Sequence, residues 1–210
     1  MFAVLLVFNV VLIGCARASA QQFDSEDYFY TAPRGDGVVI TAYTGPNLEV
    51  RIPPTIQGLR VGIIGGESFA HRNLISVTIP NSVLAIEWNA FAYNQLTSVT
   101  IPNSVVVIGD GAFMVNQLNS VTIPNRVTTI RSSAFMFNQL TSVIIPDSVT
   151  FIGASAFEGN HITSIIIGEN VDLEVSAWRG PFEFHFHTFY NNNGRRAGTY
   201  TWNGHSWSFR

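Results

Sequence analysis

The sequence predicts a repeat solenoid, in which short coils stack on one another and share one parallel β-sheet. The main observation is a repeat of 22 residues, which places apolar residues at Leu74, Leu96, Leu118, Leu140 and Ile162. The units align without gaps, so the coils should have equal lengths. The second observation is that the period is lost after residue 175, where aromatic residues become frequent. We therefore expect about five to six coils with little helix and a β-rich C-terminal cap.

Each unit contains a short strand followed by a turn. In one representative unit, the apolar residues have the spacing of a strand with one inward face, at Leu96, Val99 and Ile101. Pro102 has no backbone N–H, so it should end the strand and begin the turn. Val105 and Ile108 supply a second inward row on the opposite arc. Stacked units would place these strands side by side in a parallel sheet.

Two columns recur in the turns. One is expected to form a continuous buried stack and consists of Phe69, Phe91, Phe113, Phe135 and Phe157. Burying one phenylalanine contributes roughly 1.5–3 kcal/mol, so this column should be a major part of the core. The other should bond the backbone of its own and the neighbouring coil, and consists of Asn94, Asn116, Asn138 and Asn160. Arg72 occupies this column in the variant first unit, so the ladder should end there; a polar binding row is the alternative interpretation.

These patterns divide the chain into five segments. We expect a leader at 1–20, a linker at 21–36, a variant repeat at 37–73, the 22-residue repeats at 74–175 and an aromatic β-rich cap at 176–210.

The leader is typical of a secretion signal, because residues 1–14 are apolar apart from Asn9. Two processing sites compete. Cys15, the only cysteine, follows Leu12-Ile13-Gly14 as the lipidated cysteine of a bacterial lipobox would, whereas Ala18-Ser19-Ala20 is a small-x-small cleavage site. Cleavage at either place leaves Cys15 outside the folded domain, so no disulfide is expected.

The C-terminal segment predicts a β-hairpin cap, which the last coil of a solenoid needs because its core is otherwise exposed. Asn203-Gly204 predicts a two-residue turn. That turn would pair Trp202 with His205 and Tyr200 with Trp207.

Upstream, residues 181–187 alternate between phenylalanine and polar residues, which predicts a half-buried strand. Its outward residues Glu183, His185 and His187 are a candidate metal site, because imidazoles at alternating strand positions can bind zinc. No fourth ligand is identifiable, and a solvated polar face is the simpler interpretation.

The unit L-x-x-V-x-I-P-x-S-V-x-x-I-x-x-x-A-F-x-x-N-x resembles the BspA-like leucine-rich repeat of bacterial surface proteins. The resemblance covers roughly residues 38–175, and four complete units match at nearly every column. Members often have cysteine where this chain has its asparagine column, and either residue can lie buried at a bend. The resemblance implies a right-handed leucine-rich-repeat solenoid that binds extracellular matrix or host-cell proteins, with no catalytic residues.

The side chains that point out of the predicted sheet form the candidate binding surface. Most are small and carry a hydroxyl, but the surface becomes apolar toward its C-terminal end: Ser76, Thr78, Ser98, Thr100, Ser120, Thr122, Ser142, Ile144, Ser164 and Ile166. One interpretation is that such residues suit a tightly curved sheet. A second is a protein-binding face anchored by the two isoleucines. A third, an ice- or crystal-binding array, fits less well, because a curved sheet matches a flat surface badly and the threonine column breaks at Ile144.

The composition excludes several classes of function. Charged residues make up 12% of the chain and the net charge is −3, so no basic surface for nucleic acid is expected. The sequence has no Gly-x-Ser-x-Gly elbow, His-Glu-x-x-His helix or phosphate-binding glycine loop, so we expect neither an enzyme nor a cofactor.

The sequence therefore predicts a secreted or lipid-anchored scaffold at the outer surface or in the periplasm. Its expected partners are extracellular, host or matrix proteins, and it would contact a membrane only through a lipid on Cys15. The alternative is a structural envelope module that self-associates.

Overall fold

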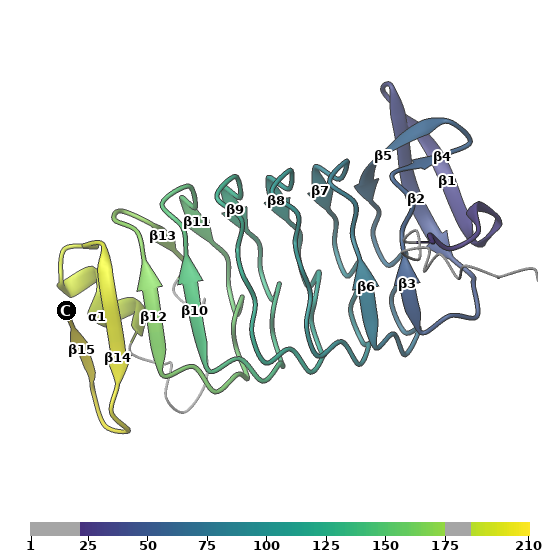
Figure 1. Ribbon diagram of the computed structural model, residues 1–210. Helices are drawn as coiled ribbons and strands as arrows, with labels where there is room; N and C mark the ends of the chain where they lie inside the picture. The colour runs from purple at the N-terminus through teal and green to yellow at the C-terminus, as the bar shows by residue number, and fades with distance from the viewer. Residues whose placement is uncertain (1–21, 175–185) are drawn as a thin grey trace, which may run out of the picture.

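The computed structural model describes residues 22–174 and 186–210. The coils stack in a nearly straight row, with a β-hairpin at the N-terminal end and a helix and second hairpin at the C-terminal end (Figure 1). Two rows of parallel strands run along the stack. The described part is a β-solenoid of about six turns with very little helix, as the 22-residue repeat predicts.

The first row of strands is the one that the spacing of Leu96, Val99 and Ile101 predicts. It begins with β3 (Glu49–Arg51) and β6 (Ser76–Thr78), which pair in parallel. It continues through single bridges at Thr100 and Thr122. It ends with β10 (Ser142–Ile145) and β12 (Ser164–Ile167), which pair in parallel and are extended by the C-terminal hairpin.

The second row is a sheet of nine strands, which the sequence predicted only as a second inward row. Its repeat strands are β5 (Leu59–Ile64), β7 (Ala85–Ile86), β8 (Val107–Ile108), β9 (Thr129–Ile130), β11 (Phe151–Ile152) and β13 (Asp172–Leu173). They pair in parallel at a spacing of one coil, and β4 (Thr55–Ile56) turns back antiparallel onto β5. Adjacent coils are thus hydrogen-bonded to each other through both rows of strands.

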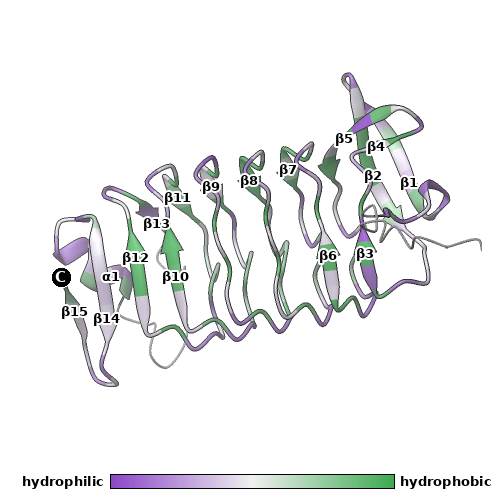
Figure 2. Cartoon of the chain, viewed as in Figure 1, coloured by the Kyte–Doolittle hydropathy of each residue, from purple (hydrophilic) through white to green (hydrophobic). Residues whose placement is uncertain are grey.

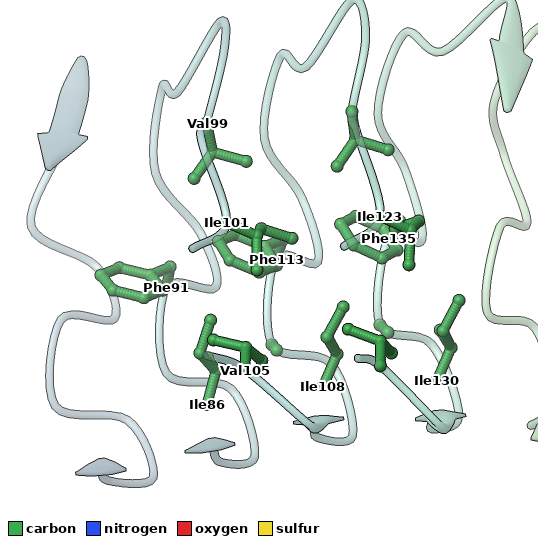
Figure 3. Close-up of a cluster of buried hydrophobic side chains, with 14 of the residues drawn as sticks. Ile86, Phe91, Val99, Ile101, Val105, Ile108, Phe113, Ile123, Ile130 and Phe135 are labelled. Carbon is green, nitrogen blue, oxygen red and sulfur yellow. The ribbon is translucent and has the colours of Figure 1, made fainter. Parts of the chain in front are cut away.

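The phenylalanine column lies in the core, where Val, Ile and Phe side chains of successive coils meet (Figure 3). All five phenylalanines have no exposed surface. Their rings stack nearly parallel, with centroids 5.0–5.5 Å apart from Phe69 to Phe157. The predicted continuous stack is confirmed.

The asparagine column links each coil to the one before it. Asn138 donates from Nδ2 to the carbonyl of Phe113 in the preceding coil at 2.9 Å and to that of Phe135 in its own coil at 3.1 Å. Its Oδ1 accepts from the backbone N–H of Leu118 at 3.0 Å. Asn94 bonds Arg72 and Leu74 in the same way, so the ladder ends at the first unit as predicted. A buried amide without these partners would be costly, which explains why the column is uniform.

The turns contain two columns of residues with positive φ. Residues other than glycine and asparagine adopt this conformation at a cost. The first column holds mostly small or polar residues: Glu67, Asn89, Gly111, Ser133 and Ser155. The second ends with Gly159 but otherwise holds bulkier residues: His71, Tyr93, Val115 and Phe137. Val115, at φ 54°, is β-branched and the least suited of these to its backbone.

Part of the segment expected as a linker is folded. Residues 26–28 form the 3-10 turn η1 (Glu26–Tyr28), and β1 (Phe29–Arg34) pairs antiparallel with β2 (Gly37–Tyr43). Phe29 is buried, and the Tyr43 ring stacks on Phe69 with centroids 5.4 Å apart. The linker prediction is wrong over this stretch, because the N-terminal end of the phenylalanine stack also needs covering. The hairpin lies outside the 22-residue period, so the period gave no sign of it.

The C-terminal cap combines α1 (Phe186–Asn192) with the hairpin of β14 (Gly198–Trp202) and β15 (Trp207–Phe209). Phe186, Tyr190 and Tyr200 are fully buried, and their rings pack together with centroids 5.4–5.9 Å apart. Burial raises the pKa of Tyr200 to about 12. The Tyr190 hydroxyl donates to the Gly168 carbonyl at 2.7 Å, which fixes the cap to the last coil.

The predicted hairpin is present, but its register differs. Trp202 pairs with Trp207 and Tyr200 with Phe209, so the connection has four residues instead of two. The Asn203 side chain explains the longer loop, because its Oδ1 accepts from the backbone N–H groups of residues 205 and 206, both at 2.9 Å. The strand expected at residues 181–187 lies largely outside the described residues, and its last two residues belong to α1.

Candidate functional site

The outward side chains of the first row of strands form a continuous surface, called the strand face below. Its residues are Ser76, Thr78, Ser98, Thr100, Ser120, Thr122, Ser142, Ile144, Ser164 and Ile166. All are exposed except Ser164, which is half-buried. The register aligns them in columns, since Thr78 bridges to Thr100 and Thr100 to Thr122, while Ser142 pairs with Ser164 and Ile144 with Ile166. The structure therefore brings together all the residues that the sequence assigned to this surface.

The strand face extends beyond those residues at both ends. At the N-terminal end, Glu49 pairs with Ser76 and Arg51 with Thr78, and both charged side chains are exposed. The Val50-x-Ile52-Pro53 pattern, which matches Val77-x-Ile79-Pro80, could have revealed them. At the C-terminal end, β14 adds antiparallel to β12 and continues the columns with half-buried threonines at positions 201 and 199. No periodic signal predicts that addition, because β14 lies outside the repeat.

The strand face changes character along the solenoid. It is charged at Glu49 and Arg51, hydroxyl-bearing through the middle, and apolar at β10 and β12 (Figure 2). Ile144 is 58% exposed and Ile166 is 42% exposed, although neighbouring inward isoleucines are almost completely buried. Covering one such side chain contributes roughly 1.5–3 kcal/mol, so this end of the face has the largest potential for contact.

A hollow lies beside these two isoleucines. It measures about 540 Å³ and is lined by Ile144 and Ile145 of β10, the turn at residues 146–148, Ile166, Asn125 and the start of β14 at Gly198. Asp147 in that turn provides the one charged side chain of its lining. A partner side chain that enters this hollow would meet an apolar wall and a turn rich in polar groups. Ligand sites commonly combine apolar walls with a few polar groups in this way.

The straight row of coils is relevant to the interpretation of the strand face as an ice- or crystal-binding array. A curved sheet would match ice or a crystal surface badly, but the stack shows little curvature (Figure 1). The other objection remains, because the threonine column ends where Ile144 and Ile166 replace it.

The remaining candidate residues lie elsewhere. Cys15, Glu183 and His185 fall outside the described residues. His187 lies in α1, where its Nε2 is 2.9 Å from the Asn191 side-chain nitrogen. Across residues 22–174 and 186–210, no three His, Cys, Asp or Glu side chains gather closely enough to hold a metal ion. In the same ranges, no helix has the length and apolarity needed to cross a membrane.

A family profile described as the BspA type leucine rich repeat region matches residues 62–180 as six copies, over more than half of the chain. The chain belongs to this family. The resemblance inferred from the repeat unit is thereby confirmed, and the family's members are repeat scaffolds. No curated protein matches the sequence.

Several solved structures are similar to this chain. A leucine rich repeat protein from T. pallidum is 24% identical with a TM-score of 0.61, over 69% of this chain and 71% of that protein. The pneumococcal vaccine antigen PcpA is 16% identical with a TM-score of 0.51, over 68% of this chain and 48% of the antigen. A leucine rich cell surface protein from Faecalibacterium prausnitzii is 22% identical with a TM-score of 0.39, over 90% and 61%. The chain thus spans less than two thirds of the last two, and identities this low concern the fold alone.

Proposed function

We propose that this protein is an extracellular protein-interaction scaffold that contacts its partner through the C-terminal end of the strand face. The observation that carries the proposal is the exposed pair Ile144 and Ile166 beside the 540 Å³ hollow. Exposed apolar side chains that lie together on a rigid surface usually mark a contact site. Membership of a family of repeat scaffolds supports an interaction role, and the apolar leader at residues 1–14 supports export.

The chemistry of the strand face restricts the partner. The surface between Thr78 and Ile166 presents no charged strand residue, so long-range attraction contributes little there. Affinity would come from covering the two isoleucines, and specificity from hydroxyl groups that donate and accept hydrogen bonds around them. A neutral, partly apolar patch on an extracellular or host matrix protein satisfies both requirements.

The test measures binding to a panel of purified extracellular-matrix proteins by surface plasmon resonance. The variant Ile144→Thr/Ile166→Thr continues the threonine column and removes the apolar pair. We expect it to weaken binding at least tenfold. Leu84→Ser is the matched control, because Leu84 is 40% exposed but lies outside the strand face. Equal binding by wild type and the double variant would refute the proposed contact surface, and absence of binding to every matrix protein would refute that partner class.

Self-association is the second candidate function. It is favoured by the uncharged hydroxyl columns, which are complementary to themselves, and by the apolar pair at one end of them. Light scattering over a range of protein concentrations separates the two functions. Oligomers that dissociate in Ile144→Thr/Ile166→Thr would favour assembly, whereas a monomer at all concentrations favours recognition of another protein.

We further propose that the protein is anchored through a lipid on Cys15. Its support is the Leu12-Ile13-Gly14-Cys15 sequence, since two or three acyl chains on one cysteine hold a protein firmly at a membrane. Mass spectrometry of the native N-terminus tests this. A diacylglyceryl group on Cys15 is the expected result, and a free N-terminus at Gln21 would show that the protein is released.

A further inference from the structure

A second candidate site lies in the turns, away from the strand face. Five coils present the same column there, occupied by Gly66, Trp88, Asp110, Ser132 and Ala154. Trp88 is the one large side chain in it, and half of its surface is exposed. The fold does not require a large residue at this position, because the other four coils form the same turn with small or short ones.

The preceding coil holds the Trp88 ring in place. The indole lies against Gly66, where an added Cβ would collide with the ring. The backbone is fixed as well, since the Glu67 N–H donates to the Trp88 carbonyl at 3.0 Å. The Glu87 carboxylate accepts from the Gly66 N–H at 3.3 Å. The ring is therefore positioned before any ligand arrives, which lowers the entropic cost of binding to it.

A hollow of about 450 Å³ lies next to this ring. Its lining includes Trp88, Glu87, Gly109, Asp110 and Arg131. Gly109 allows the two coils to pack closely at this place, because an added Cβ would collide with the backbone of residues 86–88. Trp88 and Arg131 belong to coils two steps apart, a separation of about 10 Å at the usual distance between neighbouring strands. A single ring-shaped ligand fits between them.

The polar side chains of the hollow do not use up their hydrogen-bonding capacity on one another. Asp110 accepts from the Ser132 N–H with Oδ1 at 3.2 Å, which leaves its second carboxylate oxygen available. Within the described residues, the Arg131 guanidinium makes no hydrogen bond or ion pair. The hollow thus offers hydrogen-bond donors and acceptors together with an apolar ring face.

We propose that this hollow binds a neutral sugar ring of a glycan. The apolar C–H face of a sugar can pack on the indole, and its hydroxyls can both donate to Asp110 and accept from Arg131. Two carboxylates against one guanidinium disfavour an acidic ligand, and a ligand rich in neutral hydroxyls can use both the carboxylate acceptors and the guanidinium donors. A neutral polyhydroxylated ring satisfies all four side chains.

The test is isothermal titration calorimetry, in which the full chain is titrated with neutral hexasaccharides of glucose, mannose, galactose and N-acetylglucosamine. We expect saturable binding of at least one of them and at least a tenfold weaker affinity in Trp88→Ala and in Arg131→Gln. Arg131 is exposed, so its variant keeps the test valid if Trp88→Ala fails to fold. No binding of any hexasaccharide by wild type, or unchanged affinity in Arg131→Gln, would overturn the proposal.

Two controls separate this site from the strand face. Ile144→Thr/Ile166→Thr should bind the hexasaccharide as wild type does, and Trp88→Ala should bind a matrix protein as wild type does. Loss of glycan binding in the isoleucine variant would place the sugar on the strand face and overturn the assignment to Trp88.

Discussion

The turn columns and the strand face belong to the same coils but differ in how uniform they are. The phenylalanine column keeps one residue type through five coils, and the asparagine column keeps one through four. The strand face instead changes from Glu49 and Arg51 through serine and threonine to Ile144 and Ile166. Each phenylalanine stacks on its counterpart in the next coil, and each asparagine bonds the backbone of the coil before it. The strand-face side chains are instead exposed to solvent, apart from the half-buried Ser164.

This difference indicates that stability and recognition reside in separate columns. A phenylalanine or asparagine in a turn must fit the two coils beside it, so packing and hydrogen bonding determine its identity. A residue on the strand face is free of that constraint and can vary with the partner. Changes in the phenylalanine and asparagine columns should therefore reduce the free energy of unfolding, and changes on the strand face should leave it nearly unaltered.

The largest effect is expected from Phe113→Ala, in the middle of the stack. Phe113 is fully buried between Phe91 and Phe135, with centroids 5.4 and 5.5 Å away. We expect its truncation to lower the free energy of unfolding by about 3–5 kcal/mol, as measured by urea denaturation. A loss below about 1 kcal/mol, the range of an ordinary surface substitution, would mean that the stack is not a main source of stability.

Asn138→Ala should have the next largest effect. It removes the partner of the Leu118 N–H and of the carbonyls of Phe113 and Phe135. Each buried group left without a partner costs about 1–3 kcal/mol, and we expect a total loss of about 3 kcal/mol by the same measurement. The exposed neighbour Gln139→Ala is the control. Equal losses in the two variants would show that the asparagine ladder contributes nothing beyond its surroundings.

Val115→Asn should be stabilising, in contrast to the first two changes. Val115 has φ 54°, which a β-branched residue adopts at a cost and asparagine tolerates. We expect a gain of about 1 kcal/mol in the free energy of unfolding. Val106→Asn, a change of the same type at a residue without positive φ, should give no gain. Equal effects at the two positions would show that the strain at Val115 is not relieved.

The same contrast explains what the sequence could predict. The phenylalanine stack and asparagine ladder were predictable because every coil repeats the same contacts at a spacing of 22 residues. The hairpin of β1 and β2, the helix α1 and the four-residue loop at Asn203 were not, because each occurs once and depends on contacts outside the period. The strand face was predictable from alternation alone. Its extension by β14 was not predictable from the sequence. Neither was the hollow at Trp88, because it depends on how closely neighbouring coils approach at Gly66 and Gly109.

The most direct test is the urea unfolding free energy of Ile144→Thr/Ile166→Thr. Both isoleucines are exposed, and threonine is equally suited to a strand. If the strand face serves recognition, this variant should unfold within about 1 kcal/mol of wild type, since surface changes are usually within about 0.5 kcal/mol each. A loss of about 3 kcal/mol, comparable to that of Phe113→Ala, would show that these isoleucines belong to the structural columns and would contradict the separation of stability from recognition.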